Sequence, residues 1–588
     1  MPKPVFTSKK APAPVAKVAT KAPAKARKSP AKPRKPRKQS SKGKAPAKVA
    51  KADTSPAPLA SVPVSLSRSY PRHADYAKHW SPLQTNIFDF IRGGSGSGIV
   101  EAVAGSGKTT TICEGARYMH GTIVALAFNR SIAKELKERF ASFPLVTAGT
   151  VHSIGLKALR TLPHFVKVDG DKMKWIFKDS LQTETNWIAS GNACKLATMA
   201  KDAGAGIDFR FDDVAAWQKL AEHFSIPATQ NSKNGQETFD IIALAMKLLD
   251  LSNKDIKAIK NGKTMLRVDF SDMIYLPILW NLPLEKFDWI IVDEAQDLNL
   301  TRRLFIRALS KSTSRHLIVG DTYQAIYGFT GADADSMKNM KEAFKCQTFP
   351  LSICYRCSAS VIEFSQTWMP YVEASPSAPL GSVTTLDYTK AMETPAQGFL
   401  PSDVILCRNN APIVKTAMQF IRANVSVKVE GNDLTSQLVT LADEFKNAGD
   451  LLSIRNAVTA ASDERIAEAQ AKGRNGKASQ IHDLSETLIV FIDRTIEMHG
   501  TYEEMIAMIR GFFATSYDNG DSREVLTLST IHKAKGREWK RVFWLGREQF
   551  QPSKFAKLEW ELGQEKNLCY VAATRAKLDL VELVNYPV

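Results

Sequence analysis

The sequence predicts an α/β protein built on two parallel-sheet cores that are covered by helices. Short apolar segments alternate with helix-compatible ones after residue 70, which is typical of parallel strands joined through helices. A glycine-rich loop follows one apolar segment, and adjacent carboxylates follow another. At 588 residues the chain is too long for one hydrophobic core, so we expect several domains.

The expected strands are short and apolar. They span Ile123 to Phe128, Trp289 to Val292, His316 to Gly320, Val404 to Cys407, Val525 to Leu528 and Arg541 to Leu545. Two longer tracts have a mostly helical pattern and are predicted to be insertions, residues 156–265 in the first core and 411–515 in the second. The cores themselves are then expected to comprise residues 71–155 with 266–345, and residues 346–410 with 516–588.

Most of the net charge lies at the N-terminus. Residues 1–60 contain 17 Lys or Arg against one acid, Asp53, and so carry +16 of the +19 total. Residues 1–70 are rich in Lys, Pro and Ala and have few large apolar groups, so we expect a disordered tail. Its function is open between nonspecific binding of nucleic-acid phosphates and a solubilising or targeting extension.

The glycine-rich loop has the composition of a phosphate-binding loop. Small residues let backbone N–H groups converge on phosphate oxygens at a helix N-terminus, while a lysine neutralises charge and a hydroxyl ligates Mg²⁺. Ala102 stands where the strict pattern has glycine, but Gly105 and Gly107 still allow a close approach. The predicted nucleotide-binding residues here are Ala104, Gly105, Ser106, Gly107, Lys108, Thr109 and Thr110.

Asp293 and Glu294 follow the apolar run Trp289 to Val292. A buried strand that ends in two carboxylates can hold a metal ion with the first and activate water with the second. Together with Lys108 and Thr109, these residues predict hydrolysis of a nucleotide, with Thr109 and Asp293 as the metal ligands.

Cysteine usage and hydropathy exclude other classes of protein. The seven cysteines are scattered and odd in number, which indicates reduced thiols. Cys354 and Cys357 have the spacing of metal ligands, but no second pair completes a site, so we interpret them as incidental thiols. No apolar run reaches the roughly 18 residues of a membrane span, and no secretory segment follows Met1. We expect a cytoplasmic, nucleoid-associated protein without membrane contact, or a nuclear one in a eukaryotic host.

The motifs taken in order resemble those of superfamily 1 helicases of the UvrD/Rep/PcrA type, and in detail those of the F-box DNA helicase subgroup. Besides the phosphate-binding loop and the acidic strand, the matching blocks are Leu83-Gln84, Ala127 to Arg130, Thr150 to Ser153, Asp269 to Ile274, Gly320 to Ala332, Tyr355-Arg356, Ser529 to Trp539 and Asn567 to Ala576. The resemblance covers about residues 82–577. It implies two RecA-like cores with ATP and Mg²⁺ bound between them.

The resemblance also implies functions for residues outside the phosphate-binding loop. Gln324 would sense the γ-phosphate and position the attacking water, and Arg356 and Arg575 would act as arginine fingers from the second core. Gln84 and Tyr355 would bracket the adenine, and Glu538, after Gly536, would meet the ribose. The catalytic residues expected on this basis are Lys108, Asp293, Glu294, Gln324, Arg356 and Arg575.

DNA contacts follow from the same resemblance. The matching positions are Phe128, Asn129, Thr150, His152, Tyr327, Phe329, Thr530 and His532, with Phe329 the best candidate for base stacking. The expected partners are single-stranded DNA and single/double-strand junctions, with nonspecific DNA bound by the tail. No protein partner is indicated.

Only 13 residues follow Arg575, so the hairpin that splits the duplex in UvrD-type enzymes is expected to be absent or much shortened. Three hypotheses remain open. They are a DNA helicase moving 3′ to 5′, a DNA-stimulated translocase that unwinds poorly, and a nonenzymatic DNA-coating protein.

Overall fold

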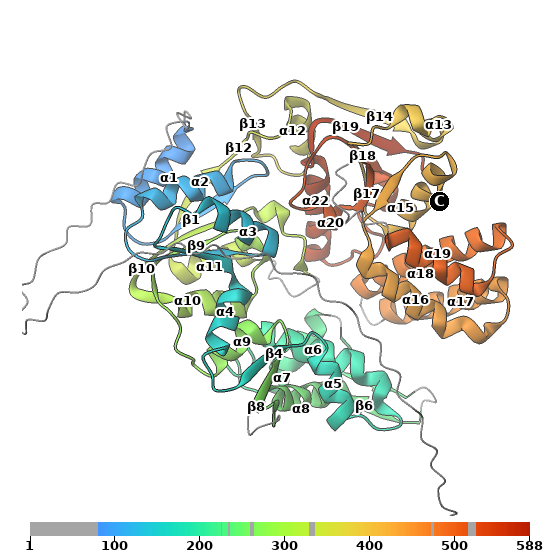
Figure 1. The fold of residues 1–588 in the computed structure, drawn as a ribbon, viewed down its shortest axis with the longest axis horizontal. Coiled ribbons are helices and arrows are strands. Elements are labelled where there is room, and N and C mark those ends of the chain that lie inside the picture. The colour runs from blue at the N-terminus through green and yellow to red at the C-terminus, as the bar shows by residue number, and fades with distance from the viewer. Residues whose placement is uncertain are drawn as a thin grey trace, which may run out of the picture. The chain divides into compact units, whose positions relative to one another are not determined.

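The computed structural model describes residues 80–224, 226–232, 236–258, 264–328, 335–471, 475–514 and 525–587. The expected tail and Phe329 lie outside these residues. Within them the chain forms two six-stranded sheets covered by helices, which confirms the predicted α/β class with parallel-sheet cores (Figure 1).

The first sheet has the strand order β11-β1-β10-β9-β2-β3, and all its pairings are parallel. Its strands are β1 (Gly98–Ala102), β2 (Ile123–Ala127), β3 (Val146–Thr150), β9 (Phe287–Val292), β10 (Ser310–Gly320) and β11 (Gln347–Leu351). Every residue of β2 is buried, as expected of a central strand covered on both faces. Because the strands are parallel, their carboxyl ends share one edge, where ligands bind in such sheets.

The second sheet has the order β14-β19-β18-β15-β17-β16 and is also parallel. Its strands are β14 (Ser382–Asp387), β15 (Val404–Cys407), β16 (Val427–Val429), β17 (Leu526–Thr530), β18 (Trp539–Leu545) and β19 (Ala576–Val584). A separate two-stranded pair joins β12 (Ile353–Cys354) and β13 (Glu373–Ala374).

Two expected boundaries are wrong. Residues 346–351 are expected in the second core, but β11 pairs with β1 in the first sheet. Likewise β16 lies inside the tract 411–515 that is expected to be an insertion, yet it pairs with β17 in the second sheet. Both are edge strands, of five and three residues, and are too short for their own apolar pattern to assign them to a sheet.

Helices connect the strands of both sheets. Those of the first core are α1 (Pro82–Gly93), α2 (Lys108–Gly115), α3 (Arg130–Arg139), α4 (Val151–Leu159), α9 (Asp272–Leu279), α10 (Leu300–Ala308) and α11 (Ser336–Phe344). Those of the second are α12 (Ala359–Ser365), α13 (Tyr388–Glu393), α14 (Pro395–Gly398), α15 (Asn410–Arg422), α20 (Ile531–Ala534), α21 (Arg547–Phe550) and α22 (Glu559–Ala573). Several begin at polar caps: the Asn129 and Thr150 side chains accept hydrogen bonds from the first turns of α3 and α4.

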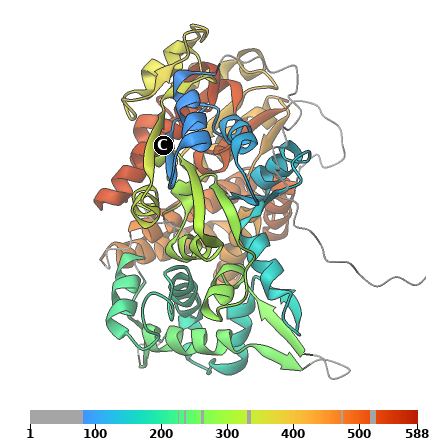
Figure 2. The same ribbon diagram turned by 90° about the vertical axis from the view of Figure 1, so that its left-hand side faces the viewer.

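The first insertion mixes helices with short strands. It contains α5 (Lys172–Ser180), α6 (Ser190–Asp202), α7 (Val214–His223) and α8 (Ile241–Asn253), together with a three-stranded sheet of β4 (Phe165–Val168), β8 (Thr264–Val268) and β7 (Ile256–Ala258) and the pair β5 (Thr229–Asn231) and β6 (Thr238–Asp240). Strands β7 and β8 form an antiparallel hairpin, drawn in green in Figure 2.

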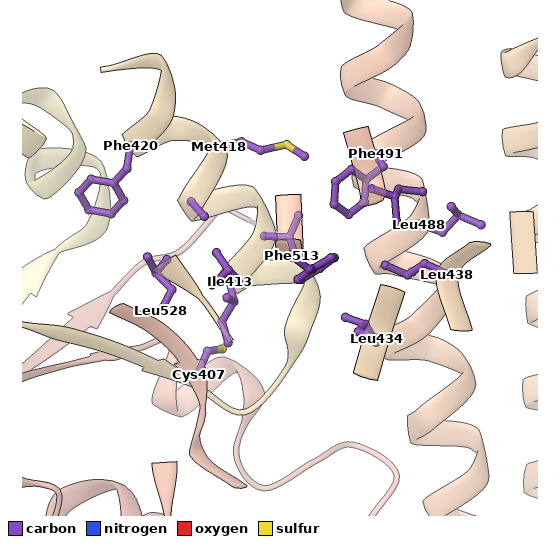
Figure 3. Packing of buried hydrophobic residues seen from close by; sticks show 14 of the residues in the cluster. Cys407, Ile413, Met418, Phe420, Leu434, Leu438, Leu488, Phe491, Phe513 and Leu528 are labelled. Atoms are coloured by element: carbon purple, nitrogen blue, oxygen red, sulfur yellow. The ribbon is translucent and has the colours of Figure 1, made fainter. Parts of the chain in front are cut away.

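The second insertion is helical: α16 (Asn432–Phe445), α17 (Leu451–Ala471), α18 (Asn475–Glu497) and α19 (Tyr502–Ala514). Helices α17 and α18 lie side by side (Figure 1). Figure 3 shows Leu438 of α16 and Leu488 and Phe491 of α18 in one buried cluster with Ile413 and Leu528 of the second core. The insertion is thus fixed to its sheet by a continuous apolar core.

Among the described residues, no helix combines the length and the apolar composition needed to cross a membrane.

Candidate active site

The phosphate-binding loop joins β1 to α2. Gly105 and Gly107 have φ of +68° and +80°, a region that residues with side chains rarely adopt. A Cβ atom added to Gly105 would lie 2.5 Å from Cβ of Arg356 and 2.9 Å from Sγ of Cys354. Gly105 is therefore required both by its backbone conformation and by the close approach of the segment that carries Arg356.

The loop has the properties of an anion site. The Ser106 hydroxyl is buried without a hydrogen-bond partner in the protein. Lys108 begins α2, and its Nζ lies 3.5 Å from the Val103 carbonyl oxygen, so the ammonium stays folded over the loop. An orphaned hydroxyl, a helix N-terminus and a lysine together fit a phosphate group.

The two carboxylates after β9 have opposite electrostatic environments. Burial and the adjacent Glu294 raise the pKa of Asp293 to about 7. Burial also opposes ionisation of Glu294, but the charges of Lys108 and Lys535 lower its pKa below the ordinary value. A divalent cation bound by Asp293 and Thr109 would therefore relieve the repulsion between the two carboxylates. Mg²⁺ suits such a site, because two protein ligands leave coordination positions for phosphate oxygens and water.

A chain of amides connects the carboxylates to Gln324. Gln296 Nε2 donates to Glu294 Oε2 over 2.5 Å, and Gln296 Oε1 accepts from the Asp321 backbone N–H over 3.0 Å. Gln324 Nε2 in turn donates to Asp321 Oδ2 over 2.6 Å. The structure thus brings Gln324 to the carboxylates through Gln296 and Asp321, two residues of the matching motifs that the sequence alone does not single out.

The two predicted arginine fingers are held by groups of their own core. Arg575 is buried, and its guanidinium donates to the carbonyl oxygens of Val571 and Arg537, 2.8 and 3.0 Å away. Burial, together with the charge of Arg356, lowers the pKa of Arg575 to about 10. Arg356 forms an ion pair with Glu538 at 2.5 Å. The guanidinium of Arg575 is hydrogen-bonded to uncharged oxygens and lies near that of Arg356. Their combined positive charge favours binding of an anion.

Several contacts join the phosphate-binding loop to the second core. The Tyr570 hydroxyl accepts a hydrogen bond from the Ala104 N–H over 2.8 Å, and the Tyr355 N–H donates to the Gly105 carbonyl over 3.0 Å. Lys535 Nζ lies 2.6 Å from both Asp297 Oδ2 and the Gln324 carbonyl oxygen. The sequence does not single out Tyr570 or Lys535, because only the folded chain shows that they reach the other sheet.

Some of the residues expected to bind the adenine and the ribose form contacts within the protein. Gln84 Nε2 donates to Thr111 Oγ1 over 3.0 Å, and Gln84 Oε1 accepts from the Ser81 N–H at the start of α1. Tyr355 is 49% exposed, so its ring is available for stacking. Glu538 is paired with Arg356 and, at 2.6 Å, with Lys577. Gly536 has a φ of +84° with open space around its Cα.

Four of the predicted DNA-contact residues of the first core lie at the carboxyl ends of β2 and β3, and Tyr327 follows β10. Phe128 follows β2 and stacks on Tyr327, with ring centroids 6.1 Å apart and planes 14° from parallel. Asn129 and Thr150 are helix caps, with their oxygens 2.9 and 3.1 Å from the N–H groups that they accept. Phe329 is not described.

The two histidines among the predicted DNA-contact residues, His152 of the first core and His532 of the second, are neutral at pH 7. Burial lowers the pKa of His152 to about 4 and that of His532 well below its usual range. They can therefore accept or donate hydrogen bonds to bases and sugars but add no charge near a phosphate. In the second core, Thr530 is buried at the end of β17, and the carbonyl oxygen of His532 accepts a hydrogen bond from the Tyr327 hydroxyl over 3.3 Å.

Cys354 and Cys357 are buried free thiols beside the loop. Within the described part of the chain, no group of three or more His, Cys, Asp or Glu is arranged to hold a metal ion.

Two parallel sheets with a phosphate-binding loop, an acidic strand end and arginines from the facing sheet are the features expected of P-loop nucleotide hydrolases with two RecA-like cores. Residues 83–345 match the family of the UvrD/REP helicase N-terminal domain. The chain is 22% identical to DNA helicase II of Haemophilus influenzae over 82% of its own length and 81% of that protein. It is likewise 22% identical to the ATP-dependent DNA helicase PcrA of Staphylococcus aureus and to that of Staphylococcus epidermidis, each over 84% of this chain and 82% of the relative. The chain is therefore similar to superfamily 1 helicases of the UvrD/Rep/PcrA type over most of its length.

Proposed function

We propose that this protein is an ATP-dependent DNA helicase that moves 3′ to 5′ on single-stranded DNA and unwinds duplexes, and that it falls in the F-box helicase subgroup by its motif details. The observation that carries the proposal is the contact between Gly105 and Arg356. The segment that carries Arg356 of the second core lies against the phosphate-binding loop of the first, which supports the proposal that one nucleotide is held by both cores.

Each residue of the site has a chemical task in hydrolysis. Glu294 is the general base, because Lys108 and Lys535 keep it ionised beside the expected position of the γ-phosphate. Gln324 orients the water, with its amide fixed by Asp321. Thr109 and Asp293 would hold Mg²⁺, which when bound would supply charge stabilisation for phosphoryl transfer.

Movement along DNA would follow from competition between ATP and the protein's own groups for Arg356 and Arg575. In the present arrangement Arg356 is neutralised by Glu538, while Arg575 donates to backbone oxygens. The γ-phosphate of ATP would compete for both guanidinium groups and draw the second core toward the loop, and hydrolysis would release it. Such alternation between closed and open cores is the stroke of a motor.

The DNA strand would run along the carboxyl edge that carries Phe128 and Tyr327. Two nearly parallel aromatic rings at 6.1 Å form a stacking platform, and slight separation would admit a base between them. Aromatic stacking is tolerant of sequence, as required for movement along any strand. With the 3′ to 5′ polarity that the resemblance implies, the expected substrates are single strands and junctions with a 3′ single-stranded tail.

Strand displacement tests the proposal. We expect ATP-dependent displacement of a fluorescent strand from a duplex with a 3′ tail, little displacement from one with a 5′ tail, and none by the Glu294→Gln variant. Efficient displacement only from the 5′-tailed duplex would contradict the polarity. ATP hydrolysis stimulated by DNA without displacement from either substrate would identify a translocase that remodels nucleoprotein instead.

A further inference from the structure

Arg302 on α10 lies behind the predicted stacking platform. Its guanidinium carbon is 5.1 Å from the centroid of the Phe128 ring, within the range of a cation–π interaction. Its Nη1 donates to the Asp297 carbonyl oxygen over 3.1 Å, which fixes the guanidinium relative to the acidic strand end. Arg302 therefore contacts one face of Phe128, while Tyr327 stacks with that ring at 6.1 Å.

These contacts continue into the second core and close a ring. Lys535 Nζ is 4.7 Å from the centroid of Tyr327, and the same ammonium pairs with Asp297 at 2.6 Å. The order around the ring is Arg302, Phe128, Tyr327, Lys535 and Asp297. Both cations thus flank the aromatic pair, and both are anchored on one residue of the segment that carries Glu294.

The surroundings keep Arg302 charged although it is partly buried. Burial lowers its pKa, but Asp202 of the first insertion and Asp297 counteract this effect. Arginine suits this position because its planar guanidinium can lie over a ring and hydrogen-bond at its edge at the same time. A positive charge behind Phe128 also polarises the ring that would meet a DNA base.

We propose that Arg302 is a positioning residue for DNA binding, which holds the Phe128 ring in the plane needed to stack on a base. The proposal rests on the function proposed above, because it assumes that Phe128 contacts DNA. Arg302 would act only through Phe128 and would not touch the DNA or ATP.

Binding of single-stranded DNA that contains the fluorescent base 2-aminopurine tests this inference, because stacking on an aromatic ring quenches that base. The variants are Arg302→Met, which removes the charge and keeps the volume, and Arg302→Lys, which keeps the charge. The matched control is Arg307→Met, since Arg307 is exposed on the same helix.

For Arg302→Met we expect a weaker quench and a Kd for DNA raised about three- to tenfold, the range that removal of a cation–π interaction would cause. Arg302→Lys should recover part of both signals, and Arg307→Met should match the wild type. In the Phe128→Leu background, Arg302→Met should cost no further affinity, because the ring through which it acts is gone.

Unchanged Kd and quench in a folded Arg302→Met variant, with folding checked by thermal unfolding, would overturn the inference. If that variant does not fold, the Arg302→Lys variant alone tests the inference. A Kd and a quench equal to those of the wild type would then overturn it, and a partly raised Kd with a partly reduced quench would support it. An equal loss of affinity on the Phe128→Leu background would also overturn it, by showing that Arg302 acts independently of the ring. If the wild-type protein neither binds single-stranded DNA nor hydrolyses ATP faster with it, the failure lies with the proposed function and not with Arg302.

Discussion

Glu294 has a left-handed backbone, with a φ of +53°, a conformation that residues other than glycine, asparagine and aspartate seldom adopt. The surrounding contacts maintain it: Gln296 donates to its carboxylate, and its own N–H donates to Asp293 Oδ1 over 2.9 Å. Strained conformations of this kind cluster at functional sites, where they aim a side chain. The conformation supports the assignment of Glu294 as the general base.

Replacing Glu294 by Gln should lower ATP turnover by about a hundredfold or more, because the amide cannot take a proton from water. Binding of ATP and Mg²⁺ should be retained, since Thr109 and Asp293 are unchanged. Steady-state hydrolysis and the binding of a fluorescent ATP analogue measure the two quantities, with Glu101→Gln as an exposed control. Near-normal turnover would remove Glu294 from its assigned function.

Gly105 and Gly107 allow a comparison in which backbone strain is matched. Both have a positive φ, but an added Cβ would collide with Arg356 only at Gly105, and at Gly107 it would have Gln84 Nε2 at 3.6 Å as a neighbour. We expect Gly105→Ala to weaken ATP binding clearly more than Gly107→Ala, with the difference measured by nucleotide titration. Equal weakening would mean that the approach of the second core to the loop does not matter for nucleotide binding.

At the scale of elements, the first insertion is tied to its core by buried ions. Lys201 of α6 lies 2.7 Å from Asp269 and 2.6 Å from Asp272, and Lys172 of α5 lies 2.7 Å from Asp272. Burial opposes ionisation of Asp272, but Lys201 and Lys172 lower its pKa. These contacts explain the Asp269 to Ile274 block physically: it fixes α5 and α6 to the start of α9.

Asp272→Asn should destabilise the protein by about 3–5 kcal/mol, because it leaves a buried lysine without its full countercharge. The free energy of unfolding in urea measures this effect, and Asp250→Asn, in the exposed pair with Lys254, is the control. Since the pKa of folded Asp272 lies below its unfolded value, its contribution is present above the unfolded pKa and is lost as the pH falls. A cost below about 1 kcal/mol at pH 7 would show that the network is dispensable.

The elements that could be predicted from the sequence are those whose own residues, or their immediate neighbours in the chain, carry the pattern. Val404–Cys407 forms a strand with the expected bounds, and the glycine-rich turn before Lys108 has the expected strand and helix on either side. The sequence misplaces strands β11 and β16 because a short edge strand is defined by its partner and not by its own pattern. The small sheet of the first insertion escapes prediction for the same reason.

Tertiary contacts explain why the sequence does not reveal parts of the site. Lys535, Tyr570 and Arg302 are ordinary residues in sequence and become significant only because they reach across to Asp297, Ala104 and Phe128. The carboxylates after β9 and the phosphate-binding loop could be recognised as candidates because their expected chemistry depends on residues close together in the chain. The contacts of residues far apart in sequence could not.

At the scale of the whole molecule, the charge distribution predicts a separate function for the N-terminus. Residues 1–60 carry +16 of the +19 net charge. Their removal should flatten the slope of log affinity for DNA against log salt, by about 0.7–0.9 for each phosphate that they neutralise in the full-length protein. Turnover at saturating DNA should barely change. Superimposable slopes for the full-length and truncated proteins would leave targeting or solubility as the function of this segment.

The proposed function requires that the ATP site be coupled to a DNA strand, and the contacts of Lys535 with Asp297 and Gln324 would provide such coupling. The most direct measurement is the rate of ATP hydrolysis by the full-length protein with Mg²⁺, with and without single-stranded DNA. We expect slow hydrolysis by the protein alone and stimulation of about tenfold or more by DNA, with hydrolysis abolished in Glu294→Gln. Equal rates with and without DNA would contradict it.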